Sequence, residues 1–186
     1  VAADGGNASA SGSLELIRVS NATQSWLGVE ASTLDFGLDF APVTLAVTNG
    51  ALKLNQATNA SRVDWSDINI ALDGDTFNVG VANTVDMTVS GDASIGFDDL
   101  LTVDGSFTLV QQDADATNVT SAPTVFAGAK ALILNLTVAA DGGNASASGS
   151  LELIRVSNAT QSWLGVEASN LNFGLDFAPV TLAVTN

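Results

Sequence analysis

The chain has no cysteine, no histidine and no tyrosine among its 186 residues. Without cysteine, a disulfide framework, a thiolate zinc site and a thiol nucleophile are all excluded. Without histidine, the usual general base is missing and a Ser-His-Asp triad cannot be assembled. A pair of carboxylates is the remaining route to hydrolysis, but Glu15 and Glu30 stand at outward positions of alternating segments. We therefore expect a protein that is not an enzyme.

Positive charge is scarce. Five Lys and Arg residues face 20 Asp and Glu residues, which gives a formal net charge of −15. Such a surface repels the phosphates of nucleic acid and the headgroups of anionic lipid, so we expect neither as a partner. The sequence contains no run of about twenty apolar residues, so no membrane insertion is expected. A hydrophobic content of 46% nevertheless argues for a folded chain.

Helical periodicity is nearly absent, and apolar residues recur at every second position instead. This alternation places apolar side chains on one face of an extended segment and small or polar ones on the other. Half-buried antiparallel strands have this pattern. The alternating apolar sets are Leu34 to Phe40, Val43 to Val47, Ile68 to Leu72, Phe77 to Val81, Val85 to Val89 and Leu132 to Val138.

Turn-forming dipeptides separate several of these runs. Asn-Gly and Asp-Gly accept the positive φ angles of tight hairpin turns, so we expect turns at Asn49-Gly50, Asp73-Gly74 and Asp104-Gly105. The Gly- and Ser-rich stretch Asp4 to Ser13, which recurs as Asp141 to Ser150, reads as a surface loop. Because proline cannot donate to a strand ladder, Pro42, Pro123 and Pro179 are expected at strand starts, edges or loops.

The sequence repeats itself. Val1 to Asn49 recurs as Val138 to Asn186, and only Thr33/Asn170 and Asp35/Asn172 differ between the copies. So faithful a duplication indicates a tandem array. We expect residues 1–137 to be one full repeat unit, residues 138–186 to begin the next, and the natural chain to run on at both ends.

A weaker repetition lies inside the unit. Segments that begin at Gly12, Gly50 and Gly105 share the form Gly, small, large apolar, any, Leu. Nine or ten residues later come Asn21-Ala22-Thr23, Asn59-Ala60-Ser61 and Asp115-Ala116-Thr117. Chance recurrence of common strand and turn residues is one interpretation. Three degenerate subunits that start near residues 12, 50 and 105 and contact mainly their neighbours are the other.

In its acidic, cysteine-free, Ser/Thr/Asn/Gly-rich repeats and its Gly-Ser-Leu-x-Leu strand openings, the chain resembles the tandem β repeats of giant bacterial surface proteins and large repeat adhesins. The resemblance covers the whole chain and names a class of proteins. It implies an extracellular or cell-surface location, a bacterial source, and a role as a spacer or attachment rod whose partners are adjacent repeats and possible surface glycans or proteins.

Two ligand hypotheses stand beside the structural one. Carboxylate-rich loops supply the hard oxygen ligands that calcium prefers, although each Asp-Gly is also an ordinary hairpin turn. The calcium candidates are Asp73, Asp75, Asp98, Asp99, Asp113 and Asp115. Tryptophans stack on sugars when they are exposed, but in strands they more often belong to a core or to a seam between modules. The candidates for a sugar platform are Trp26, Trp65 and Trp163.

Together these patterns predict an all-β, elongated tandem-repeat assembly of mostly antiparallel strands in two packed layers. The alternative is a β-solenoid, which the hairpin dipeptides disfavour. The predicted function is a structural stalk that gives reach and stiffness without any required cofactor. A calcium- or carbohydrate-binding module of a surface protein is the alternative.

Overall fold

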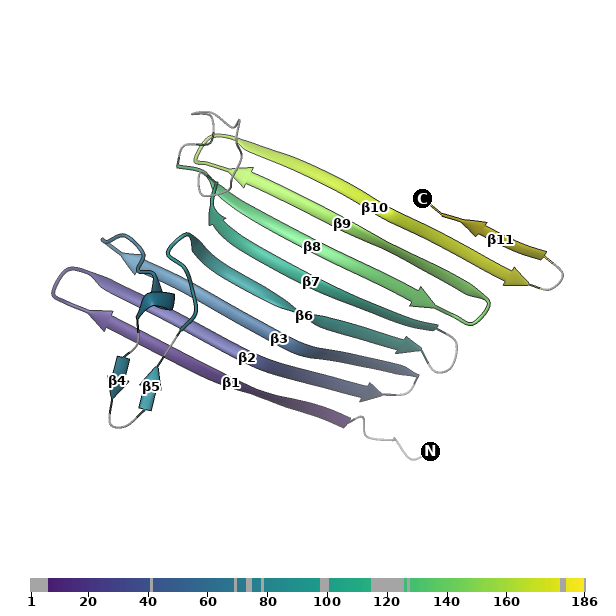
Figure 1. The fold of residues 1–186 in the computed structure, drawn as a ribbon, viewed down its shortest axis with the longest axis horizontal. Coiled ribbons are helices and arrows are strands. Elements are labelled where there is room, and N and C mark those ends of the chain that lie inside the picture. The colour runs from purple at the N-terminus through teal and green to yellow at the C-terminus, as the bar shows by residue number, and fades with distance from the viewer. Residues whose placement is uncertain are drawn as a thin grey trace.

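The computed structural model describes residues 7–40, 42–68, 70–72, 75–77, 79–97, 101–114, 126, 128–177 and 180–185. Nine strands form one open antiparallel sheet in the order β1-β2-β3-β6-β7-β8-β9-β10-β11 (Figure 1). Their bounds are Asn7–Ser20, Ser25–Phe40, Val43–Thr58, Val85–Phe97, Leu101–Asp113, Lys130–Asp141, Ala145–Ser157, Ser162–Phe177 and Val180–Val184. A separate pair of antiparallel strands is formed by β4 (Ile70–Leu72) and β5 (Asp75–Phe77), and the 3-10 turn η1 spans Trp65–Asp67.

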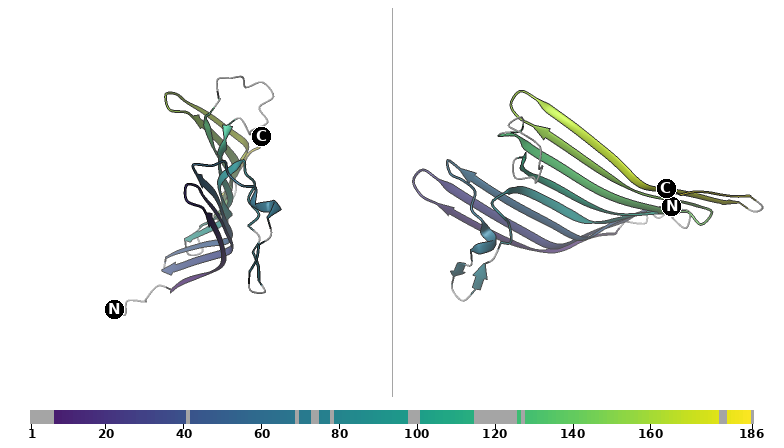
Figure 2. Two further views of the ribbon diagram at one scale, coloured as in Figure 1. Left: turned by 90° about the vertical axis from the view of Figure 1, so that its left-hand side faces the viewer. Right: turned by 45° about the horizontal axis from the view of Figure 1, so that its top comes forward.

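The prediction of an all-β, mostly antiparallel chain is confirmed, since all pairings among the described strands are antiparallel. The two packed layers are not confirmed, because the described strands of the main sheet form one layer (Figure 2). The parallel β-solenoid does not form in this part of the chain either. No helix within the described residues is long and apolar enough to cross a membrane.

Alternation gives the sheet two unlike faces. Residues directly opposite one another on neighbouring strands point to the same side, so a row of paired residues shows the character of one face. We call the side that carries Leu14, Leu134 and Phe173 the apolar face, and the other side the polar face. One row of the apolar face crosses all nine strands without a polar side chain. It runs Ala8, Leu38, Leu45, Ile95, Val103, Ala140, Ala147, Phe173 and Val184.

The polar face carries mainly Ser, Thr, Asp and Glu and is covered in part by the connection between β3 and β6. We call this connection, residues 59–84, the arm; it stands off one side of the sheet in the left view of Figure 2. A small core forms beneath it from Ile17 of β1 and the arm residues Trp65, Val79 and Val81. A second core joins Ala114, Ala129, Ala131 and Val156 near the start of β8.

Two of the three predicted turns are wrong. Asn49-Gly50 lies inside β3, and Asp104-Gly105 lies inside β7. Asn49 has a φ of 53°, and the β3–β6 register shifts between Thr48 and Ala51. The left-handed conformation that an Asn-Gly pair favours is therefore used for a bulge within a strand. Asp73-Gly74 lies outside the described residues, but β4 and β5 pair antiparallel on either side of it, with Leu72 opposite Asp75.

The loop predictions are also wrong for most of their length, because β1 begins at Asn7 and β9 begins at Ala145. The serines of β1 alternate with Ala8, Ala10, Gly12 and Leu14, which is a strand pattern with small residues on its apolar side. Pro42 lies between β2 and β3, as predicted, while Pro123 and Pro179 fall outside the described residues. Gly12, Gly50 and Gly105 all lie inside strands.

The two sequence copies adopt matching structures. Ser20 pairs with Ser25 in the first copy, and Ser157 pairs with Ser162 in the second. Each hairpin turns through an Asn-Ala-Thr-Gln segment whose Asn Oδ1 accepts hydrogen bonds from the next two polar residues, at 2.9 and 2.8 Å from Thr23 N and Gln24 N and at 3.0 and 2.8 Å in the copy. The same Asn-centred turn thus closes the corresponding hairpin in both copies.

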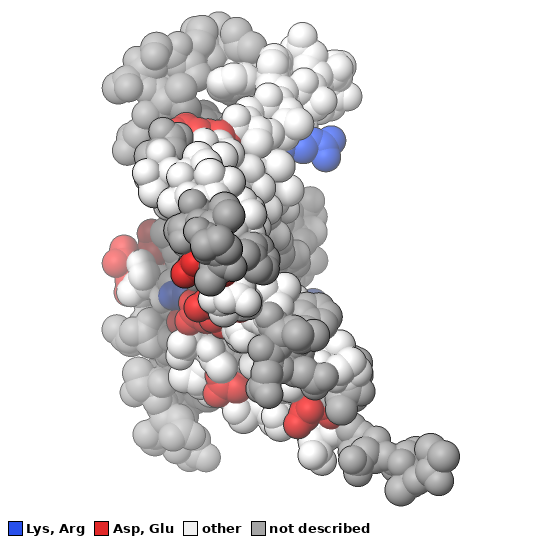
Figure 3. Space-filling view, turned by 90° about the vertical axis from the view of Figure 1, so that its right-hand side faces the viewer, with Lys and Arg blue, Asp and Glu red and all other residues white. Residues whose placement is uncertain are grey.

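Acidic side chains are dispersed in the space-filling view of Figure 3, where Lys and Arg are few. Along the strands, carboxylates such as Asp92, Asp104, Glu152 and Glu167 occupy the polar face, since they alternate with apolar-face residues. Most carboxylates of the described strands of the main sheet therefore lie on its polar face.

Candidate functional site

The arm is fixed to the sheet chiefly by Trp65. Its side chain is 1% exposed and lies against the backbone of Gly28 on β2. A Cβ added at Gly28 would stand 2.9 Å from both Cδ2 and Cε2 of the indole. No larger residue at position 28 leaves room for the ring, so this glycine acts as the seat of the arm.

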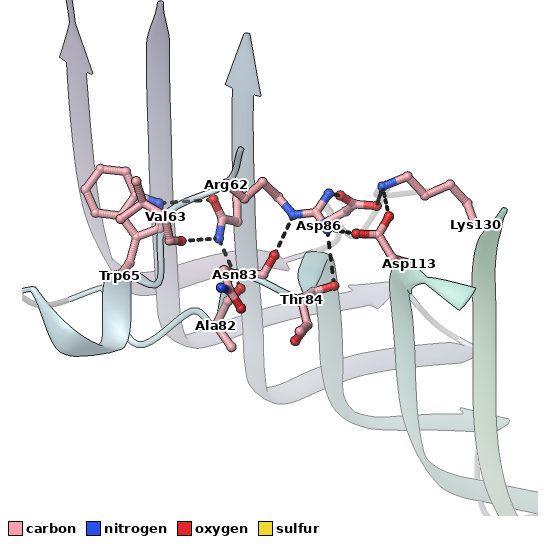
Figure 4. Close-up of polar contacts among 10 residues, drawn as sticks. Arg62, Val63, Trp65, Ala82, Asn83, Thr84, Asp86, Asp113 and Lys130 are labelled. Carbon is pink, nitrogen blue, oxygen red and sulfur yellow. Dashed lines mark hydrogen bonds and ion pairs between the residues drawn. The ribbon is translucent and has the colours of Figure 1, made fainter. Parts of the chain in front are cut away.

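Asn55 of β3 completes the seat. It is buried, its Oδ1 accepts a hydrogen bond of 3.1 Å from Trp65 Nε1, and its Nδ2 donates to Val63 O at 2.8 Å and Ala82 O at 3.0 Å. One amide side chain therefore holds the arm at its anchor and near both of its ends (Figure 4). Among the described residues no buried side-chain polar atom is left without a partner, so burial of this amide carries no desolvation penalty from unmade bonds.

Further polar contacts fasten the arm along its length. Trp26 Nε1 donates to Ser61 O at 3.0 Å, and Asn59 Nδ2 donates to Thr23 O at 3.0 Å. Gly80 N donates to Glu30 Oε2 at 2.8 Å, while Lys53 Nζ lies 3.1 Å from Glu30 Oε1 and donates to Gly80 O at 2.9 Å. The arm is held by backbone and side-chain bonds from β2, from β3 and from the turn between β1 and β2.

A charged cluster lies beside this seat, where β3 and β6 part. Arg62 of the arm forms ion pairs with Asp86 of β6 and Asp113 of β7. Lys130 of β8 lies 2.7 Å from Asp86 Oδ2 and 2.6 Å from Asp113 Oδ1. Arg62 also donates from Nε to Asn83 O at 2.7 Å (Figure 4). Two cations and two carboxylates cancel in charge and link the arm to three strands, so we name this group the charged lock.

The charged lock shifts two pKa values. Burial alone would raise the pKa of Asp113, but hydrogen bonds and charge from Lys130 and Arg62 outweigh it and lower the pKa below its ordinary value of 3.8. Burial would lower the pKa of Lys130, but hydrogen bonds to Asp113 and Asp86 raise it above 10.5. Both groups are therefore charged across the neutral range.

A pocket of about 660 Å³ opens next to the lock. It lies beyond the last β3–β6 pair, Leu54 with Met87, where β3 continues to Thr58 and none of the described strands pairs with it on that side. Gln56, Gln111, Arg62 and Lys130 contribute to its lining. Both cations are already paired with carboxylates, so the pocket offers amide and backbone hydrogen-bonding groups rather than a free charge.

The calcium candidates are placed as follows. Asp73, Asp98, Asp99 and Asp115 lie outside the described residues, and for Asp75 only the backbone position at the start of β5 is described. Asp113 lies in the charged lock, with a cation on each oxygen. Within the described residues no three His, Cys, Asp or Glu side chains come together to hold a metal ion.

The three tryptophans all pack against apolar neighbours. Trp65 is buried in the seat, and Trp26 packs against the same core while it donates to the arm. Trp163, the counterpart of Trp26, contacts Phe126 edge to face with ring centroids 5.1 Å apart. Trp26 and Trp163 remain partly exposed. Trp65 lies in the 3-10 turn η1 and not in a strand, and it is buried in a core as a structural tryptophan would be.

Sequence reasoning missed the residues that define the seat. Gly28 looked like an ordinary strand residue, and Asn55 and Arg62 carried no motif. Gly28 and Asn55 fall at the small or polar positions of alternating strands. Nothing local in the sequence shows which residue packs on them, because that depends on the path of the arm.

The sequence matches no protein-family model, and comparisons with curated proteins and with solved structures give no significant match.

Proposed function

We propose that the chain is a structural spacer of a large secreted or cell-surface adhesin, in which tandem repeats extend one continuous antiparallel sheet. The observation that carries this proposal is the position of the second copy. Strands β9, β10 and β11 repeat β1, β2 and β3 in the same register and join the same sheet through β8. A repeat is therefore added by strand pairing, with no linker between units.

The size of one step follows from the strand order. One unit contains β1, β2, β3, β6, β7 and β8, which is six strands before the pattern begins again at β9. At about 4.8 Å between neighbouring strands, a unit extends the sheet by roughly 29 Å. Pairing carries Leu14 across the sheet to Leu153, which is the counterpart of Leu16. Each unit is thus also displaced along the strands by two residues, or about 7 Å.

The proposal includes a second layer over the apolar face. Exposed side chains on this face include Leu14, Phe36, Leu164, Val166 and Phe173. A contiguous apolar surface of this extent favours burial, and stacked sheets pack about 10 Å apart through interdigitating side chains. A second copy of the same face is the occupant that we propose, because most of the carboxylates of the strands lie on the polar face and would stay in water.

The proposed location is extracellular, on the resemblance to bacterial repeat adhesins and on composition. A cysteine-free, acidic and regularly repeated sheet gains its stability from strand pairing, apolar packing and ion pairs such as those of the charged lock, without disulfides. Reach and stiffness are then the properties on which such a molecule is selected.

Small-angle X-ray scattering on arrays of one, two and four 137-residue units tests the spacer function. We expect the maximum dimension to grow linearly, by about 30 Å for each added unit. A maximum dimension that levels off, or units that move independently, would contradict the proposal. The same samples titrated with calcium test the alternative, since a metal-binding module would show a calcium-dependent rise in melting temperature.

A further inference from the structure

Among the described strands, β1 has no neighbour on its outer side, whereas the strand of the same sequence in the second copy has one. Residues 7–20 and residues 144–157 have the same sequence, Asn-Ala-Ser-Ala-Ser-Gly-Ser-Leu-Glu-Leu-Ile-Arg-Val-Ser. In the second copy this sequence forms β9, which pairs with β10 on one side and with β8 on the other. In the first copy it forms β1, which pairs with β2 alone among the described strands. On its outer side β9 has β8 as a neighbour, which β1 lacks among the described strands; β1 is in addition covered by the arm at Ile17.

The two copies differ in exposure. Val156 is 8% exposed in a core with Ala131 of β8 and with Ala114 and Ala129 from outside β8, whereas its counterpart Val19 is 43% exposed. Leu14 is 68% exposed, whereas its counterpart Leu151, opposite Leu136, is partly buried. The first copy therefore presents the apolar side chains and the backbone groups that its twin buries against β8.

From this comparison we infer that the β1 edge is a specific acceptor for a strand with the sequence of β8, Lys130–Asp141, supplied by an adjoining repeat. Addition of an extended strand to a sheet edge gains main-chain hydrogen bonds, and alternate side chains give it specificity. The inference rests on the proposed spacer function, and it names β8 of the adjoining repeat as the strand that pairs with the β1 edge.

The observed pairing of β8 with β9 gives the register that we expect on β1. Lys130 pairs with Ser157, Leu134 with Leu153, and Leu136 with Leu151. On β1 the incoming strand would accordingly place Lys130 opposite Ser20, Leu134 opposite Leu16, and Leu136 opposite Leu14. A slip of one residue would turn Leu134 and Leu136 to the polar face and abolish the match.

The sheet has a second free edge that serves as a control. On β11 the side chain of Leu182 is 51% exposed, and β11 pairs with β10 alone among the described strands. Its counterpart in the first copy is Leu45 of β3, which pairs with Ile95 of β6. The β11 edge is therefore matched to a β6-like strand and should not prefer β8.

Disulfide trapping with a synthetic peptide tests the inference, and the absence of native cysteine makes every engineered thiol unique. The peptide has the sequence of Lys130–Asp141 with Leu136→Cys. It is mixed in a glutathione redox buffer with the full chain that carries Leu14→Cys, Leu16→Cys or Leu182→Cys. Directly opposed residues lie about 4.5–5.5 Å apart, within disulfide range, whereas diagonal neighbours lie about 7–8 Å apart.

We expect the Leu14→Cys chain to be trapped about tenfold faster than the other two, because only this pair is directly opposed. A scrambled peptide should give no preference. Equal trapping at Leu182→Cys would show unspecific edge addition, preference for Leu16→Cys would show another register, and no trapping at any site would show no acceptor. Each of these results overturns the inference.

Fusion gives a second measurement that does not depend on peptide affinity. Val1 to Asp4 has the same sequence as Val138 to Asp141, so placing Lys130 to Thr137 ahead of Val1 rebuilds the complete β8 sequence before β1. Amide exchange in β1 should then slow toward that of β9, while a scrambled fusion leaves it unchanged. If amide exchange in β1 slows but the arrays do not lengthen in the scattering experiment, the β1 edge is a strand acceptor and the spacer function is wrong. If the arrays lengthen but exchange in β1 does not slow, the spacer function stands and the acceptor inference is wrong.

Discussion

Thr33 and Asn170 occupy the same position in the two copies, and both have left-handed backbone conformations, with φ angles of 50° and 53°. The position is a bulge in β2 and in β10, where the register to the preceding strand shifts. A left-handed backbone strains a β-branched residue, whereas asparagine tolerates it. One of the two differences between the copies therefore falls where the choice of residue affects backbone energy directly.

The change Thr33→Asn should stabilise the chain by about 1 kcal/mol, because it relieves this strain without altering the pairing of β1 with β2. For a chain of this size that corresponds to a rise in melting temperature of about 2–4 °C. Asn170→Thr is the matched reverse change and should lower stability by a similar amount. Urea unfolding of both variants measures the effect, and a loss of stability in Thr33→Asn would contradict it.

The seat of the arm gives a second prediction with an internal control. Gly28→Ala places a Cβ 2.9 Å from the Trp65 ring, whereas Gly165→Ala, at the equivalent position of the second copy, meets only Ile154 Cγ2 at 3.1 Å. Overpacking costs about 1–3 kcal/mol, so Gly28→Ala should destabilise the chain by that amount and Gly165→Ala by much less. A red shift in tryptophan emission should accompany the first change only. Equal effects at the two glycines would show that Trp65 does not occupy the seat.

Asn55→Leu tests the polar half of the same seat. The change removes the acceptor for Trp65 Nε1 and the donors to Val63 O and Ala82 O. Buried groups that lose their partners cost about 1–3 kcal/mol each, so the loss should reach at least 2 kcal/mol in chemical denaturation. Amide exchange should also rise in the arm, at Trp65 N and Val81 N, while β8 and β9 stay protected. Uniform exchange across the sheet would contradict a local role.

These residues also show how far sequence patterns reach. Period-two alternation correctly predicted the strands at Leu34 to Phe40, Val43 to Val47, Val85 to Val89 and Leu132 to Val138, because each apolar residue contributes to the same face whatever its neighbours are. It was wrong at Ile68, Val79 and Val81, which lie outside strands in the arm. The turn predictions at Asn49-Gly50 and Asp104-Gly105 failed because these dipeptides tolerate unusual backbone angles or the close approach of a neighbouring strand, and neither property requires a turn. A Cβ at Gly105 would lie 2.7 Å from Thr137 O of the neighbouring strand, so this glycine serves strand contact. Pairing between distant segments, such as Gly28 with Trp65 or Arg62 with Asp113, depends on chain path and leaves no local pattern.

The charged lock predicts a defined dependence of stability on pH. A carboxyl whose pKa is lowered on folding stabilises the fold above its unfolded pKa, and this contribution is lost as pH falls through the folded value. Asp113 should therefore contribute above about pH 4, and less at lower pH. Lys130, with a raised pKa, contributes below about pH 10 and less at higher pH.

Asp113→Asn should consequently cost about 1 kcal/mol at pH 7, and the difference from the parent chain should shrink below pH 3. Urea denaturation at several pH values between about pH 2.5 and pH 8 measures the difference in the free energy of unfolding between the two chains. Asp104→Asn is the control, since Asp104 lies exposed on β7 outside the lock. A difference that stays constant over the whole range would show that the lock does not depend on the ionised carboxylate.

The apolar face makes the last prediction, because a surface that packs against its own copy must respond to a charge placed on it. Val166, at 59% exposure, points to this face, whereas Asn135 is exposed on the polar face of β8. Val166→Lys and Asn135→Lys change the net charge equally, but only the first would bury an ammonium group between stacked sheets. Sedimentation velocity over a range of concentrations should show the parent chain and Asn135→Lys associating, with Val166→Lys at least about tenfold weaker, the factor that 1.4 kcal/mol produces. Equal association of all three would mean that the contact does not lie on the apolar face, and a monomeric parent chain at every concentration would remove the second copy as the proposed second layer.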